Sequence, residues 1–281
     1  MATSLAVLSR LAAALPAPWD DALARAAAAL TPGSRHEAAR ANAAALFPNA
    51  DADHLARLAN RAYARFMIEY LREMRRSDDP ARNPLTVGPG VREALERGRG
   101  LVMCTAHVGN WEMGARTLAR LGRPIKVIAE PQYARSWRES VISAKHQAGI
   151  EILSPDTSPR LLIRSLQEGA VIGLLVDGAG YTHGRPSIVA GHAATLPSGP
   201  ARLAALSGAV LAGGTCFRTA PGRFQSELHA LAGTEQAPVR DADVLHTAMA
   251  RWLEDLLLAH PGEWCIFRPF FAHAPALRKA A

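Results

Sequence analysis

The sequence predicts an α/β protein with a largely parallel central sheet, flanked by helices and preceded by an N-terminal helical extension. From Leu85 onward, short apolar runs alternate with helical patterns, which is typical of repeated β-α units. One of these runs, Ala170–Val176, is apolar almost without interruption, as in a strand buried on both faces of a parallel sheet. Residues 4–80 instead carry apolar side chains at helical spacing.

Breaker residues divide the N-terminal part into four predicted helices. Pro16 follows the first, Pro32 ends the second and Pro48 ends the third. The predicted helices are Leu5–Leu15, Trp19–Leu30, Ser34–Leu46 and Asp53–Arg75. The apolar stripe of the last helix favours packing on the sheet, and docking of an exposed helical face on a bilayer is the alternative.

The α/β part is predicted to alternate regularly. Strands are expected at Leu101–Thr105, Ile125–Ala129, Ile150–Leu153, Ala170–Val176, Arg185–Ala190, Ala209–Phe217 and Phe224–Leu231. Helices are expected at Gly90–Arg97, Trp111–Leu121, Trp137–Ala148, Pro159–Glu168, Gly199–Ser207 and Asp243–His260. No linker rich in Gly or Ser and no repeat interrupts the chain. We therefore predict a single domain, 1–281, with a helical subregion at 1–80 and a catalytic core at 85–271.

Composition narrows the function classes. The 281 residues are 49% hydrophobic and 20% charged, which suits a folded globular chain. The net charge of +7 suits anionic lipid headgroups, nucleic acid or phosphorylated donors, but no zinc-finger or RNP-like motif supports nucleic acid. The three cysteines lie in apolar runs without a C-x-x-C pair, so we predict buried thiols and no metal site. No apolar run reaches the ~20 residues of a spanning helix.

The candidate site is the stretch Leu101–Gly114, where a predicted strand turns into a predicted helix that Asn110 is placed to cap. Open α/β sheets place reactive groups at such turns, beyond the carboxyl ends of their strands. If His107 lies on the turn and Glu112 in the first helical turn, the two side chains can meet. A carboxylate on one ring nitrogen would orient the imidazole to act as a general base. The alternative is a structural loop histidine beside an acid favoured by the helix dipole.

The segment HVGNWE, His107–Glu112, resembles the H-x-x-x-x-D/E signature of glycerolipid and lysophospholipid acyltransferases. Its Gly-Asn-Trp form is similar to the bacterial branch that contains the late acyltransferases of lipid A and the mycobacterial phosphatidylinositol mannoside acyltransferases. The likeness extends from about Leu30 to Phe271. No G-x-S-x-G elbow supplies a serine nucleophile, so the reacting hydroxyl is expected to belong to the substrate.

The resemblance also implies roles for residues outside the signature. Asp177, at the end of a strand, matches an acid that is a second partner for the catalytic histidine. The residues that match substrate-binding positions are Asn110, Trp111, Glu130, Arg138, Lys145, Arg185 and Arg268. Ala190 stands where the family often has an aromatic residue.

The expected activity is transfer of a fatty acyl chain from an acyl thioester, either acyl-CoA or acyl-carrier protein, to a hydroxyl of a glycolipid or lysolipid. His107 would be the general base, oriented by Glu112, and no cofactor or metal is expected. Two alternatives stay open, an acyl-thioester hydrolase that uses water and a non-catalytic lipid-binding relative. The basic charge and the apolar first helix predict peripheral attachment to an anionic surface, the cytoplasmic face of the bacterial inner membrane.

Overall fold

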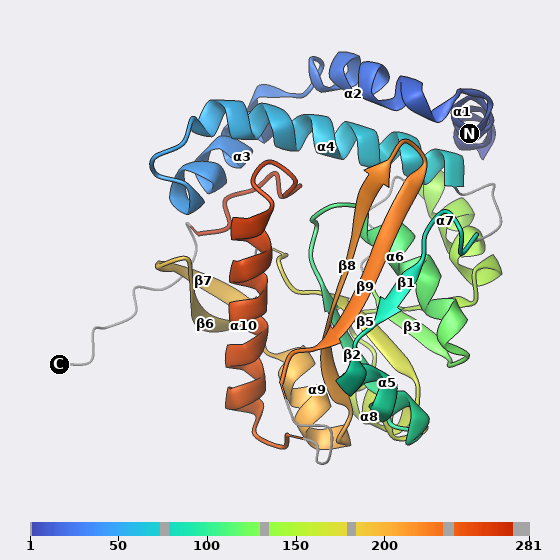
Figure 1. Ribbon diagram of the computed structural model, residues 1–281, viewed down its shortest axis with the longest axis vertical. Helices are drawn as coiled ribbons and strands as arrows, with labels where there is room; N and C mark the ends of the chain where they lie inside the picture. The colour runs from blue at the N-terminus through green and yellow to red at the C-terminus, as the bar shows by residue number, and fades with distance from the viewer. Residues whose placement is uncertain (1, 74–78, 130–134, 179–183, 233–238, 272–281) are drawn as a thin grey trace.

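The computed structural model describes residues 2–73, 79–129, 135–178, 184–232 and 239–271 (Figure 1). Its main element is a seven-stranded sheet with the strand order β1-β9-β8-β2-β5-β3-β4. Every neighbouring pair in this sheet is parallel except β8 and β9. Its strands are β1 (Leu85–Val87), β2 (Leu101–Thr105), β3 (Ile125–Ile128), β4 (Ile150–Leu153), β5 (Val171–Leu175), β8 (Val210–Ala220) and β9 (Arg223–Ala230). The predicted fold class is confirmed.

Helices cover the sheet and its end. The α-helices are α1 (Ala2–Ala14), α2 (Asp20–Ala28), α3 (Gly33–Leu46), α4 (Ala52–Glu73), α5 (Pro89–Glu96), α6 (Trp111–Thr117), α7 (Arg135–Gln147), α8 (Pro159–Gln167), α9 (Gly199–Ser207) and α10 (Ala242–Ala259). Two short 3-10 segments are η1 (Ala17–Trp19) and η2 (Leu118–Leu121). Figure 1 shows α1 to α4 lying across the end of the sheet toward which β8 points. No helix in the described part of the chain is long and apolar enough to cross a bilayer.

Both faces of the central strand β2 are buried. Leu101 and Met103 belong to one apolar cluster, which includes residues of α5 and α6. Val102 and Cys104 point the other way, into a cluster with residues of α8, α9 and α10. A strand whose alternate residues all face apolar layers must be hydrophobic throughout, which explains the uninterrupted run in the sequence.

Two strands were not predicted. The first, β1, has three residues and is too short to show a period. The second, β7 (His192–Pro197), pairs with β6 (Gly184–Val189) in a separate antiparallel hairpin. Its turn is Ala190-Gly191, and both residues have positive φ, 50° and 77°. This is the geometry of a tight hairpin turn, but a turn that begins with alanine carries a weak sequence signal.

Strand order places the carboxyl ends of β2 and β5 together. The two strands are parallel neighbours, with Thr105 in register with Leu175. After β2 the chain continues toward β3, whereas after β5 it crosses back toward β8. Ligands of open α/β sheets bind where connections diverge in this way. The loop that holds His107 lies at this edge.

Candidate active site

His107 and Asp177 meet because both follow neighbouring strands by the same distance. Each lies two residues beyond the end of its strand, in register with the other. The Nδ1–H of His107 donates to Oδ1 of Asp177 at 2.9 Å. The backbone N–H of His107 donates to Oδ2 at 2.7 Å. This double contact fixes the ring and leaves the Nε2 lone pair for a substrate proton.

Asp177 is fully buried and has a third donor. The indole Nε1–H of Trp264 donates to Oδ2 at 2.9 Å. The segment that carries Trp264 is itself tied to the loop, because the N–H of Cys265 donates to the carbonyl of His107 at 2.8 Å. Burial raises the pKa of Asp177. The charge and hydrogen bonds of His107, together with the hydrogen bond from Trp264, lower the pKa by more than burial raises it. The net pKa is below the ordinary value, so Asp177 is a carboxylate at neutral pH.

The electrostatics of His107 favour its protonated form. Burial lowers the pKa of the imidazole, but the charge and hydrogen bond of Asp177, together with the charge of Glu112, outweigh it. The net pKa lies above 6.5, although the positive charge of Arg268 opposes the rise. The side chain of His107 is 26% exposed. A substrate can therefore reach an imidazole that holds a proton more firmly than an ordinary histidine.

The expected contact between His107 and Glu112 needs correction. Glu112 lies in the first turn of α6, and its Oε2 accepts a hydrogen bond from Nζ of Lys145 in α7 at 2.5 Å. Both side chains are 12% exposed. Glu112 therefore acts on His107 through its charge, while Asp177 holds the hydrogen bond to the ring. Lys145 of α7 binds the carboxylate of Glu112, whereas Asp177 follows the neighbouring strand by the same distance as His107 and so faces the ring.

Asn110 and Trp111 form the start of α6. The Oδ1 of Asn110 accepts the N–H of Met113 at 3.1 Å and caps the helix, as the sequence predicted. The ring of Trp111 packs edge-on against the imidazole of His107, with centroids 4.9 Å apart. Its other side stacks on Phe66 of α4 at 3.9 Å. Asn110 is buried, so it contributes to the site as a support.

Not all of the remaining predicted substrate-binding residues lie close to His107. Arg268 is exposed and close enough for its charge to act on His107. Arg185 instead pairs with Asp243 at the start of α10. Trp264 follows the other end of this 18-residue helix, which is about 27 Å long at 1.5 Å per residue. Arg185 therefore lies near the start of α10, away from Trp264, and its role in substrate binding stays a prediction. Glu130 and the side chain of Arg138 lie outside the described residues.

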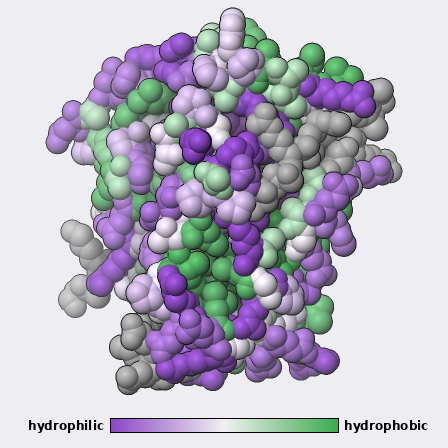
Figure 2. Space-filling model, turned by 45° about the vertical axis from the view of Figure 1, so that its right-hand side comes forward, coloured by the Kyte–Doolittle hydropathy of each residue, from purple (hydrophilic) through white to green (hydrophobic). Residues whose placement is uncertain are grey.

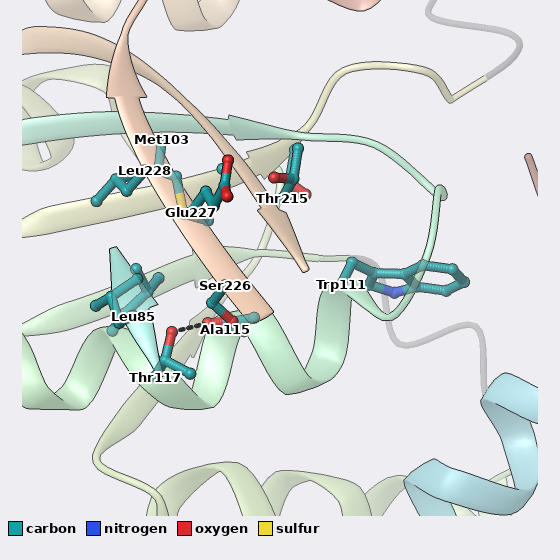
Figure 3. A pocket seen from close by; sticks show the side chains of 13 residues that line it. Leu85, Met103, Trp111, Ala115, Thr117, Thr215, Ser226, Glu227 and Leu228 are labelled. Carbon is teal, nitrogen blue, oxygen red and sulfur yellow. Dashed lines mark hydrogen bonds between the residues drawn. The ribbon is translucent and has the colours of Figure 1, made fainter. Parts of the chain in front are cut away.

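An apolar pocket lies beside Trp111, and its empty space of about 280 Å³ includes open solvent. It lies between α6 and strands of the sheet, and its lining includes Leu85, Met103, Ala115 and Leu228. Figure 3 shows Trp111 at one end, with its ring directed away from the cluster of aliphatic side chains at the other. Figure 2, which turns this side of the molecule forward, shows a hollow of hydrophobic side chains bordered by hydrophilic ones. The lining of the pocket is apolar, as a site for an aliphatic chain requires, but the space in it holds about one water molecule.

Several contributors to the site were not predicted. Glu69 of α4 and Arg218 of β8 reach the loop from outside the signature, and they are described below. The available signal was a charged residue within an apolar pattern, since Glu69 lies between Phe66 and Tyr70 on the buried stripe of its helix. Within the described residues, no group of three or more His, Cys, Asp or Glu side chains could hold a metal ion.

Comparison with known proteins points in the same direction as the geometry. Residues 3–272 match the profile of a family described as bacterial lipid A biosynthesis acyltransferase. A phosphatidylinositol mannoside acyltransferase of Mycolicibacterium smegmatis is 26% identical over 183 residues, which are 63% of this chain and 58% of that protein. Its namesake from Mycobacterium tuberculosis is 26% identical over 180 residues, 63% of this chain and 56% of that protein. The match thus spans less than two thirds of these relatives.

Proposed function

Since this chain belongs to the bacterial lipid A biosynthesis acyltransferase family, we propose that it transfers a fatty acyl chain from a thioester to a hydroxyl of a glycolipid or lysolipid. The observation that carries the proposal is the pairing of an accessible His107 with the buried carboxylate of Asp177. A neutral imidazole held by a carboxylate is the arrangement that removes a proton from a hydroxyl near neutral pH.

In the proposed reaction, Nε2 of His107 takes the proton of the acceptor hydroxyl while the oxygen attacks the thioester carbonyl. Asp177 stabilises the imidazolium that forms. The tetrahedral intermediate then collapses, the carbon–sulfur bond breaks, and the leaving thiolate takes the proton from His107. The ester and a free thiol are the products. The enzyme returns to its starting protonation state without a covalent acyl-enzyme.

The cysteines support direct transfer. Cys104, Cys216 and Cys265 are buried free thiols. Burial raises the pKa of each of them, in the case of Cys216 to about 12, so none is a ready nucleophile. The hydroxyl that attacks the thioester therefore belongs to the acceptor in our proposal.

The apolar pocket beside Trp111 is proposed to widen and hold the acyl chain, since in this structure it has room for about one water molecule. It is apolar, and Trp111 belongs both to its lining and to the contacts of His107. A chain that lies in it brings its carbonyl end toward the imidazole. The donor is acyl-CoA or acyl-carrier protein, because both present an acyl chain as a thioester. A glycolipid acceptor is favoured by the relatives, whose names specify a phosphatidylinositol mannoside.

Membrane attachment is proposed to occur through the N-terminal helices. Leu11 and Trp19 are each 58% exposed although they are large and apolar. Val7 and Leu30 are exposed on the same group of helices. Exposed apolar side chains on helices insert at a bilayer interface, and the net charge of +7 of the whole chain favours anionic lipids, with about 1 kcal/mol for each Lys or Arg close to the surface. The proposed location is the cytoplasmic face of the bacterial inner membrane.

The activity is tested by acyl transfer to a mannosylated phosphatidylinositol from palmitoyl-CoA, followed by mass spectrometry of the lipid products. His107→Ala should lower the rate about 10²- to 10⁴-fold while the far-UV circular dichroism is unchanged. Free fatty acid formed at the same rate with and without acceptor would identify a hydrolase instead. Equal lipid binding without turnover by the wild-type protein would identify a binding protein.

The acyl pocket is tested through chain-length preference. Ala115 lines the pocket, so Ala115→Leu should shift the kcat/KM optimum toward shorter acyl donors. Ala119, exposed in η2 on the same helical stretch, provides the control Ala119→Leu, which should keep the wild-type preference. An unchanged optimum in Ala115→Leu would place the chain elsewhere.

Membrane attachment is tested by vesicle flotation. The double substitution Leu11→Ser and Trp19→Ser should weaken binding to anionic vesicles, and salt should release the wild-type protein. Leu206 of α9 is similarly exposed at 59%, and Leu206→Ser should have no effect. If Leu206→Ser weakens flotation as much as the double substitution, the N-terminal helices are not the attachment surface.

A further inference from the structure

The loop between His107 and α6 is held by its side chains and backbone at several points. The N–H of Asn110 donates to the carbonyl of Cys216 in β8 at 2.8 Å. Gly109 has φ of +65°, and a Cβ at this position would lie 2.4 Å from the same carbonyl oxygen. The loop therefore runs directly against β8 and has no room to shift in that direction.

The free end of the Asn110 side chain is bound by a residue of the N-terminal helices. Its Nδ2–H donates to Oε2 of Glu69 at 2.7 Å. Both residues are buried, with 3% exposure for Asn110 and 4% for Glu69. A carboxylate placed in an apolar helical stripe is costly unless its partners compensate for the lost hydration. A buried glutamate at this position therefore indicates a specific role for its carboxylate.

Arg218 of β8 completes the cluster. It forms an ion pair with the other oxygen of Glu69. Burial, aided by the nearby charge of Arg65, lowers the pKa of Arg218 to about 10, and Asp20, Asp21 and Glu263 oppose this shift. The guanidinium is therefore charged at neutral pH. Glu69 thus joins the sheet, through Arg218, to the active-site loop, through Asn110.

The same helix makes a second contact with the loop one turn earlier. Phe66 stacks on Trp111, whose edge faces the ring of His107. Residues three apart on a helix lie on one face. Phe66 therefore contacts Trp111, and Glu69 contacts the adjacent Asn110, from the same face of α4. This two-point contact joins α4 to the loop that carries His107.

We infer that Glu69 is a positioning residue of the active site, which acts through the side chain of Asn110 to fix the loop that carries His107 and Trp111. The inference rests on the proposed function, and it adds the N-terminal helix α4 to the machinery of that site. Its physical basis is that a general base must lie within hydrogen-bonding reach of the proton it removes, and a displacement of about 1 Å can lower the rate about 10²-fold.

The test exchanges the donor and the acceptor. In Asn110→Asp, a second carboxylate replaces the amide that contacts Glu69, and repulsion should displace the loop and lower kcat about 10-fold or more. The helix cap is retained, since aspartate accepts the N–H of residue 113 equally well. In the double variant Asn110→Asp with Glu69→Gln, the new amide donates to the new carboxylate. The hydrogen bond and the total charge are restored, while Arg218 faces an amide in place of a carboxylate, so kcat should recover most of the loss. The single variant Glu69→Gln measures the contribution of the ion pair with Arg218.

Glu73 supplies the matched control. It lies one turn further along α4, its side chain is 4% exposed, and it pairs with Arg82 at 2.8 Å. Glu73→Gln should lower the melting temperature but leave kcat and KM near the wild-type values. Equal losses of kcat in Glu73→Gln and Asn110→Asp, or a double variant as slow as Asn110→Asp, would overturn the inference.

A readout without turnover separates this inference from the proposed function. The imidazole resonances of His107 can be followed by NMR as the pH is changed. Asn110→Asp should shift the resonances and the titration midpoint of His107, and the double variant should restore both. Unchanged resonances in Asn110→Asp would contradict the positioning role even if acyl transfer is confirmed. If the protein proves not to be an acyltransferase, the NMR measurement still tests whether Glu69 positions the loop of His107.

Discussion

Two carboxylates act on one histidine from different elements, and their surroundings differ. Asp177 follows the end of a strand, is fully buried, and accepts three hydrogen bonds from His107 and Trp264. Glu112 begins a helix, is partly exposed, and is paired with Lys145. The sequence signature contains only Glu112. The spacing of the signature identifies Glu112 as an acid near His107. The strand order determines that Asp177, and not Glu112, orients the imidazole.

The difference also separates two physical roles. Asp177 sets both the direction of the imidazole ring and its affinity for a proton. Glu112 contributes charge at longer range, and Lys145 neutralises part of that charge. Removal of Asp177 should therefore change geometry and electrostatics together, while removal of Glu112 should change mainly electrostatics.

The largest effect is expected for Asp177→Asn. The amide cannot stabilise the imidazolium and favours the wrong tautomer, so kcat should fall about 10³-fold or more. The measurement is single-turnover acyl transfer with saturating donor. Native circular dichroism must be checked alongside, because the buried N–H groups of His107 and Trp264 lose a charged acceptor. A variant with wild-type turnover would remove Asp177 from the site.

A smaller effect is expected for Glu112→Gln. The hydrogen bond between His107 and Asp177 stays intact, so the rate should fall about 10-fold, equivalent to about 1.4 kcal/mol in the barrier. Lys145→Met provides the companion variant, because it leaves the charge of Glu112 without a partner. If Glu112→Gln is as damaging as Asp177→Asn, the signature acid is the orienting group after all.

The smallest effect concerns stability. A histidine whose pKa is raised in the folded state stabilises the fold fully below its unfolded pKa of about 6.5, and this contribution is lost as the pH rises through the folded pKa. The difference in unfolding free energy between the wild type and His107→Gln should therefore shrink from pH 6 to pH 9, as measured by urea denaturation. In an Asp177→Asn background, that pH dependence should nearly vanish. A difference that grows with pH would contradict the sign of the shift.

The sequence predicted the loop, and the family resemblance predicted one of its partners. The apolar run before His107, the capping Asn110 and the helical pattern after it predicted a strand, a turn and a helix, and the structure has all three. The family resemblance predicted Asp177 as a partner of His107, and the structure has this contact. Local patterns alone would not have predicted it, because they do not encode the strand order that places β5 between β2 and β3. Glu69 carried a signal, as a charged residue on the apolar stripe of its helix, but the stripe does not show which residues the carboxylate contacts. The position of Arg185 at the start of α10 was not predictable either, because a motif match does not specify which helix the matched side chain pairs with.

The pH dependence of kcat/KM for acyl transfer tests the central claim most directly, that His107 held by Asp177 is the general base. The wild-type rate should rise with pH through a single ionisation above 6.5, because the base must be unprotonated to act. In Asp177→Asn, this acidic limb should move to lower pH, since loss of the carboxylate lowers the imidazole pKa. In Glu112→Gln, it should move less. An acidic limb that stays in place in Asp177→Asn, or that moves further in Glu112→Gln, would contradict the account.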